Sequence, residues 1–220
     1  MPEWATVLAA AAGGLALPGL VGVLVIRLPA GQRGCPQPGR SHRSECLAAG
    51  LTTAACCGLM ALRFGPTLQL LAFCYLAAVG VALAFIDARH RRLPNLLTLP
   101  SYPAALLLLG IAAVAEPGGL HHLVVAILAM VAAAGFLLLQ LVIYPGGIGW
   151  GDVKLAGLLG LYLGWLGPGD VLAGLLAGYV FAAAAGLALI ATGRASRKSQ
   201  IPFGPFLLGG TFAVIAAGVF

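Results

Sequence analysis

Two aspartates, Asp87 and Asp152, are the residues of this chain best suited to chemistry. Asp87 follows the apolar run 67–86, and Asp152 precedes the apolar run 153–166. Two carboxyl groups at a boundary of low polarity cannot both ionise cheaply, so their pKa values separate. The ionised group can then take a proton from water while the protonated group donates to a carbonyl oxygen, as in an aspartic protease. This chemistry needs no metal ion, and we expect neither a metal nor another cofactor.

Asp152 lies in a glycine-rich stretch, 147–154, that also holds Gly149, Gly151 and Lys154. Glycines at membrane depth let the backbone unwind or another helix approach, and an ionisable residue there suggests a functional site. The alternative is an ordinary turn with solvated charges, and the second acid, Asp87, favours the functional interpretation. Lys154 could hold the charge state of the acid or bind a substrate backbone; a solvated or lipid-facing lysine remains an equal alternative.

The composition requires a membrane protein. Of the 220 residues, 61% are hydrophobic and 8% are charged, whereas ordinary soluble domains are about 25% charged. The formal net charge of +6 could suggest a nucleic-acid partner, but the basic residues lie in short loops between apolar runs. Membrane topology explains that distribution, so the expected environment is a lipid bilayer and no nucleic acid is expected.

The elements that must position the two acids are apolar helices. A helix that crosses a bilayer needs about 20 apolar residues, and the chain has eight runs near that length, of which 153–166 and 206–220 are short. The fold expected is an all-α, polytopic bundle of about eight transmembrane segments. The runs are 6–26, 46–62, 67–86, 95–115, 123–144, 153–166, 171–192 and 206–220.

The distribution of charge orients this bundle. With both termini outside, the four loops on the cytoplasmic side hold eleven of the twelve Lys and Arg residues, and Arg63 is the exception. Shifting the frame by one run in the first half would place the basic loops outside, against the positive-inside rule. Asp87 and Asp152 then share the cytoplasmic boundary, while Glu116 and Asp170 fall on the outer side.

The chain divides into an N-terminal two-helix region with a short cytoplasmic loop, 1–66, and a six-helix core, 67–220, within one membrane domain. The first run lacks a basic segment before it, so we expect a retained helix and not a signal peptide. The five cysteines form no Cys-x-x-Cys pair, so neither a zinc site nor a structural disulfide is expected.

Three motifs resemble those of the bacterial prepilin peptidases, and the similarity extends over about residues 70–210. The second contains the Gly-x-Gly-Asp signature that these enzymes share with preflagellin peptidases and, more remotely, presenilins. The motifs are Phe85-Ile86-Asp87 with Leu93-Pro94-Asn95-Leu96-Leu97-Thr98-Leu99-Pro100, then Gly149-Trp150-Gly151-Asp152-Val153-Lys154-Leu155, and Ile201-Pro202-Phe203-Gly204-Pro205-Phe206.

The resemblance implies that Asp87 and Asp152 are the catalytic pair of an aspartic endopeptidase in the bacterial cytoplasmic (inner) membrane. It implies type IV pilin-like precursors as substrates, with a short basic leader, a Gly before the cut and an apolar helix after it. Asn95 is expected to cap the run that it begins, and the third motif to shape the substrate cleft or the turn into the last helix. The supporting residues expected are Gly149, Gly151, Lys154, Pro94, Asn95, Pro202, Gly204 and Pro205.

The N-terminal part departs from the longer members of that family. Val25-Ile26-Arg27-Leu28-Pro29 is similar to their exit from the first helix, but their cytoplasmic domain with two Cys-x-x-Cys pairs, associated with N-methylation, is replaced by the short segment 27–45. Cys35 and Cys46 are too far apart to substitute for it. The sequence therefore predicts a short form that cleaves without methylating.

Two other functions fit paired membrane acids. A transporter or proton pathway also uses them, although here both acids lie at one boundary. A scaffold that has lost catalysis is the third possibility. Retention of two acids that are costly to desolvate argues against it.

Overall fold

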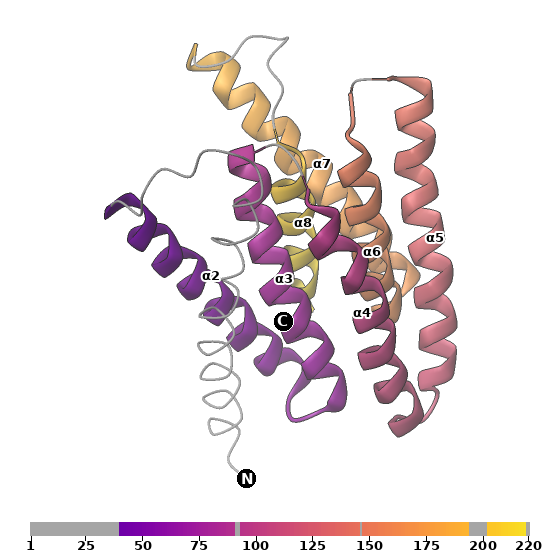
Figure 1. Ribbon diagram of the computed structural model, residues 1–220. Coiled ribbons are helices and arrows are strands. Elements are labelled where there is room, and N and C mark those ends of the chain that lie inside the picture. Colours follow the sequence, from indigo (N-terminus) through magenta and orange to yellow (C-terminus); the bar gives the residue numbers. More distant parts are fainter. Residues whose placement is uncertain (1–39, 91–92, 146, 194–201, 219–220) are drawn as a thin grey trace.

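The computed structural model describes residues 40–90, 93–145, 147–193 and 202–218, and these residues form an all-helical structure (Figure 1). An isolated bridge between Pro145 and Ile148 is the sole β-type pairing in this part of the chain. The helices are α2 (Arg40–Phe64), α3 (Leu68–His90), α4 (Asn95–Ala115), α5 (Gly119–Ile143), α6 (Trp150–Leu166), α7 (Pro168–Ala191) and α8 (Gly204–Ala217).

Several helices are long and apolar enough to cross a membrane, which confirms a multi-pass helical bundle. Five qualify by length and hydropathy: Leu47–Phe64, Leu68–His90, Asn95–Ala115, Gly119–Ile143 and Pro168–Ala191. Helix α8 is apolar but shorter, and α6 has 17 residues. The expected first span, 6–26, lies outside the described residues. The count of eight spans and the sides of the termini therefore stay predictions.

The helix boundaries follow the breakers in the sequence, with two corrections. Helix α2 begins at Arg40, inside the segment 27–45 that was expected to be a loop, and α3 continues past Asp87 to His90. After Asp87 the sequence offers no helix breaker until Pro94, and the residue before a proline disfavours helical geometry. Asp87 consequently lies within the last turn of α3 and not at its end.

Helix α6 is the central element of the bundle. Val153 and all residues from 155 to 165 are buried, and α6 contacts α4, α5, α7 and α8. Its closest neighbour is α5, because small residues line that interface: a Cβ added to Gly160 would lie 2.7 Å from the carbonyl oxygen of Ala129. Such close backbone approach is typical of helix packing in membranes.

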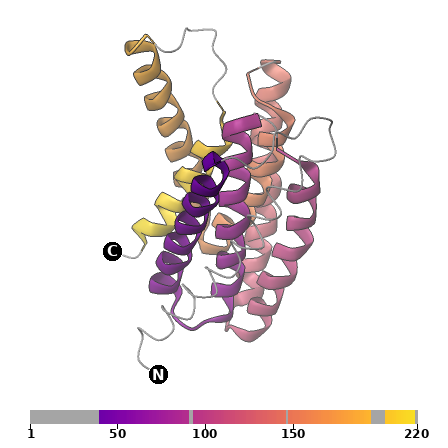
Figure 2. The same ribbon diagram turned by 60° about the vertical axis from the view of Figure 1, so that its left-hand side comes forward.

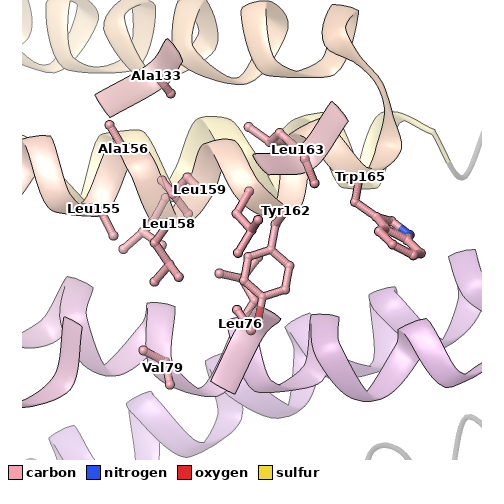
Figure 3. Close-up of a cluster of buried hydrophobic side chains, with 14 of the residues drawn as sticks. Leu76, Val79, Ala133, Leu155, Ala156, Leu158, Leu159, Tyr162, Leu163 and Trp165 are labelled. Atoms are coloured by element: carbon pink, nitrogen blue, oxygen red, sulfur yellow. The ribbon is translucent and has the colours of Figure 1, made fainter. Parts of the chain in front are cut away.

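Leucine and tyrosine side chains join α6 to α3. Figure 3 shows Leu158, Leu159 and Tyr162 pointing toward Leu76 and Val79. The Tyr162 ring also meets Phe73 edge to face, with 5.4 Å between centroids. These contacts fix the lateral position of α6 relative to the helix that carries Asp87.

The ends of four helices gather at one end of the bundle. In Figure 1 the C-terminal end of α3 and the N-terminal ends of α4, α6 and α8 lie in the upper half, and the turned view in Figure 2 agrees. Helix α8 contacts α3, α6 and α7. The two acids, one on α3 and one on α6, therefore lie at the same end.

Candidate active site

Asp87 is held by the start of α8. It is 5% exposed, and its Oδ2 accepts a hydrogen bond of 3.1 Å from the backbone N–H of Gly204. Gly204 is the first residue of α8, where the helix dipole favours negative charge. A Cβ at position 204 would lie 2.7 Å from Asp87 Oδ2. The contact therefore requires glycine, and the third sequence motif belongs to the site through this residue.

Asp152 is held by the segment that precedes its own helix. It is the third residue of α6, and its Oδ2 accepts a hydrogen bond of 3.1 Å from the N–H of Gly149. This bond is one half of a capping box. Gly151 contacts the segment before α4, since a Cβ there would lie 2.9 Å from Leu93 Cβ. The Gly-x-Gly-Asp sequence thus supplies one glycine for a backbone donor and another for close packing.

The two carboxyl groups interact electrostatically. The pKa of Asp152 is raised to about 6: burial is the largest cause, the hydrogen bond from Gly149 opposes it, and the charge of Asp87 adds a smaller increase. Asp152 precedes the apolar run 153–166, so this group lies outside the membrane-spanning segments. A backbone amide binds Oδ2 of each carboxyl. Such a pair can hold a single proton and present both an acid and a base near neutral pH.

Lys154 and Asn95 join α6 to α4 beside the acids. Lys154 Nζ donates to Asn95 Oδ1 over 2.8 Å. The expectation that Asn95 caps α4 is wrong: Pro94 occupies the N-cap position, and no side chain caps this helix. The carbonyl oxygen of Pro94 instead accepts from the backbone of Thr98 at 3.1 Å. Asn95 is the first residue of α4, and its amide oxygen is taken by Lys154.

A second link joins the same two helices about two turns further along α4. The hydroxyl of Tyr102, on α4, donates to the carbonyl oxygen of Lys154 over 2.6 Å. The ring of Tyr102 also lies against Gly157. The two links, from Asn95 and Tyr102, hold the first turns of α6 and thereby the position of Asp152.

Tyr179 and Gln140 are polar residues near the site that sequence reasoning missed. The Tyr179 hydroxyl donates to Gln140 Oε1 over 2.5 Å, and its ring packs on Phe203 with 5.1 Å between centroids. Tyr179 also lies within electrostatic range of Asp152. Gln140 could have indicated this contact, because it lies inside an apolar run. A glutamine in a membrane helix usually forms a hydrogen bond with a neighbouring helix.

The remaining predicted residues surround these contacts without binding an acid. Pro202 is half-buried just before α8, and Pro205 is in its first turn, where proline is favoured. Within the described ranges, no group of three His, Cys, Asp or Glu side chains could hold a metal ion. Cys56, Cys57 and Cys74 are free thiols, while Cys35 falls outside those ranges.

Comparison with known proteins identifies the family of this chain. Residues 74–191, just over half of the chain, match the model of the type IV leader peptidase family. This match includes both Asp87 and Asp152, and it ends before Gly204. No solved structure matches the chain significantly.

Several curated relatives are similar over most of this chain, and each carries the name prepilin leader peptidase/N-methyltransferase. The protein of Burkholderia pseudomallei strain 1026b is 38% identical over 180 residues, which are 78% of this chain and 53% of the relative. That of Pseudomonas aeruginosa is 34% identical over 71% of this chain and 53% of its own length. That of Bacillus subtilis is 29% identical over 78% and 65%. The chain matches little more than half the length of the first two.

Proposed function

Because the chain belongs to the type IV leader peptidase family, we propose that it is an aspartic endopeptidase that removes the short basic leader of type IV prepilin-like precursors. The observation that supports this most is the interaction between Asp87 and Asp152, each bound by one backbone amide at the same end of the bundle. The two-acid arrangement provides both proton acceptor and proton donor for peptide hydrolysis.

The proposed reaction needs one ionised and one protonated carboxyl. The ionised group takes a proton from a water molecule, and the water oxygen attacks the carbonyl carbon of the scissile peptide. The protonated group gives its proton to the carbonyl oxygen. When the tetrahedral intermediate collapses, the C–N bond breaks, the leaving amine takes a proton from one carboxyl, and a hydroxyl of the intermediate returns its proton to the other carboxylate. Because the two carboxyl groups interact electrostatically, we assign the proton to the pair and to neither residue alone.

The site is proposed to face the cytoplasm. Eleven of the twelve basic residues fall in loops on that side in the eight-span frame, as the positive-inside rule requires. In the described part of that frame, the helices α2 to α8 run in alternating directions (Figure 1). A precursor whose apolar helix lies in the bilayer and whose basic leader remains in the cytoplasm would present its cleavage point at this level of the inner membrane.

We also propose that this chain does not methylate the processed product. The relatives named above carry an N-methyltransferase activity in their names, but the 220 residues contain no Cys-x-x-Cys pair. Helix α2 begins at Arg40, which leaves a short segment where longer family members have a cytoplasmic domain. Membership in a peptidase family does not favour the proton-pathway alternative.

Incubation of the purified chain in detergent with a synthetic pre-pilin would test both proposals. Mass spectrometry should show the leader separated at a single bond and an unmethylated new N-terminus, even with S-adenosylmethionine present. Asp87→Asn is the matched inactive control. Intact precursor with the wild-type chain would refute the peptidase, and a methylated product that depends on this chain alone would refute the second proposal.

A further inference from the structure

A polar cavity lies at the end of the bundle opposite the two aspartates. Its volume is about 390 Å³, and six of its lining residues are Arg63, Gln69, Glu116, His122, Trp165 and Gly218. They come from the last turn of α2, the first turn of α3 and the ends of α4, α5, α6 and α8. Along α6, Trp165 is about 20 Å from Asp152 at a rise of about 1.5 Å per residue. The cavity is therefore separate from the candidate active site.

Two oppositely charged side chains, Arg63 and Glu116, line this cavity, and both are half-buried. Arg63 Nη1 and Glu116 Oε1 are buried, and neither has a hydrogen-bond partner in the part of the chain that the structure describes. A buried polar atom without a hydrogen-bond partner is costly. Arg63 is also the one basic residue that the eight-span frame places on the outer side. The positive-inside rule does not explain its presence there.

The position of Arg63 is fixed by packing. Its guanidinium carbon lies 5.5 Å from the centre of the Phe64 ring. On its other side the guanidinium occupies the space beside Gly218, where a Cβ would overlap it. Arg63 is thus held at the cavity wall with one nitrogen unpaired.

The rest of the wall is already hydrogen-bonded and forms a frame. Trp165 Nε1 donates to Gln69 Oε1 over 2.9 Å, and His122 Nδ1 lies 3.0 Å from the carbonyl oxygen of Trp165. Figure 3 shows the Trp165 indole at the far end of α6, beyond the buried leucines. The two side chains of this wall with an unpartnered buried atom are therefore one cation and one anion.

We propose that this cavity binds a small zwitterion, with a phosphate or carboxylate on Arg63 and a primary ammonium on Glu116. An anion alone would leave Glu116 unpaired, and a cation alone would leave Arg63 unpaired. A single ligand with both charges satisfies both groups by charge-assisted hydrogen bonds. The ethanolamine phosphate of a phospholipid head group has this chemistry and is available at a membrane face. A choline head group has the same charges but no N–H to donate to Glu116.

Lipid titration of the purified, delipidated full chain, followed by native mass spectrometry, would test the proposal. Phosphatidylethanolamine should bind roughly tenfold or more tightly than phosphatidylcholine or phosphatidylglycerol with the same acyl chains, because each loses one charge-assisted bond. Glu116→Gln and Arg63→Gln should each lower that affinity by a similar factor. Asp170→Asn, an acid of the outer side that does not line the cavity, is the matched control.

A soluble competitor identifies the source of the zwitterion. Displacement of the lipid by phosphoethanolamine supports a cavity that accepts the free head group, while binding of the lipid alone supports a membrane ligand. Thermal unfolding and pre-pilin cleavage by each variant show that it is folded, so a lost affinity can be assigned to the cavity. Equal binding of the three lipids by the wild type, or unchanged phosphatidylethanolamine affinity in both charge variants, would overturn the proposal.

Discussion

The backbone N–H of Gly204 donates a 3.1 Å hydrogen bond to Oδ2 of Asp87, across 117 positions of sequence. This bond joins the start of α8 to the last turn of α3, and it orients a carboxyl that is 5% exposed. The space around it is limited, because a Cβ on residue 204 would lie 2.7 Å from the same oxygen. The third motif of the sequence thus acts on the first through a backbone amide.

Gly204→Ala should lower pre-pilin cleavage by roughly ten- to a hundredfold, because a displacement of about 1 Å at a catalytic group has effects of this size. The added methyl must displace Asp87 or the start of α8. Gly209→Ala in the same helix is the matched control, since a Cβ there meets Phe181 at an ordinary 3.6 Å. Initial cleavage rates at equal protein amounts provide the measurement. Equal rates for the two alanine variants would show that the Gly204 contact has no role in catalysis.

Asp87→Asn and Asp152→Asn should each lower cleavage by roughly a thousandfold or more, because asparagine keeps the shape but cannot exchange a proton. The double variant should be no slower than either single variant, since residues that act as a unit are non-additive. Quantitative cleavage assays with membrane-inserted protein measure these rates, and Asp170→Asn should remain near wild type. Substantial turnover by either single variant would contradict the catalytic pair and would favour the proton-pathway or scaffold function instead.

The stability of the wild type should fall more steeply than that of Asp152→Asn as pH rises through about 6. Burial, as the largest cause, raises the pKa of Asp152 from 3.8 to about 6 in the folded protein. A raised carboxyl pKa contributes stability that is present below the unfolded value and lost through the folded value. The thermal midpoints should therefore agree near pH 4, and the variant should be more stable at pH 8. A wild-type midpoint that runs parallel to that of the variant across this range would contradict the assignment.

Asn95→Leu and Lys154→Met should each lower cleavage roughly two- to fivefold, because both remove one partly exposed polar link between α4 and α6. The double variant should equal the single variants, as expected for two residues in one contact. Asn95→Asp keeps an oxygen acceptor for Lys154 and should retain near-normal rates. Additive losses in the double variant would mean that Lys154 and Asn95 act separately.

His90→Cys and Pro117→Cys should react with impermeant thiol reagents from opposite sides of the membrane. Both positions are exposed and lie at opposite ends of the described bundle. In a background without the five native cysteines, His90→Cys should be labelled from the cytoplasm and Pro117→Cys from outside. Labelling of His90→Cys from the outer side alone would reverse the orientation and the proposed location of the active site.

The sequence could predict the helices because the apolar runs and their breakers are local features. The turn at Gly118, with φ of 78°, and the helix 95–115 agree with expectation. It could also single out Asp87 and Asp152, since acids are rare in this chain. The contact between Asp87 and Gly204 could not be predicted, because it depends on how α3 and α8 pack. The same holds for Asn95: its preference for capping is local, but Lys154 competes for its side chain from another helix.

The length of α6 has a consequence for water at both faces of the membrane. Its 17 residues span about 26 Å at about 1.5 Å per residue, less than the roughly 30 Å of a bilayer's hydrocarbon core. Since α6 is buried and packs against the longer helices α4, α5 and α7, water and lipid head groups can approach the centre of the bundle more closely at its two ends. One further turn would lengthen α6 by about 5.4 Å. The proposed hydrolysis at the Asp152 end and the proposed ligand binding at the Trp165 end would then both be affected by the length of this one helix.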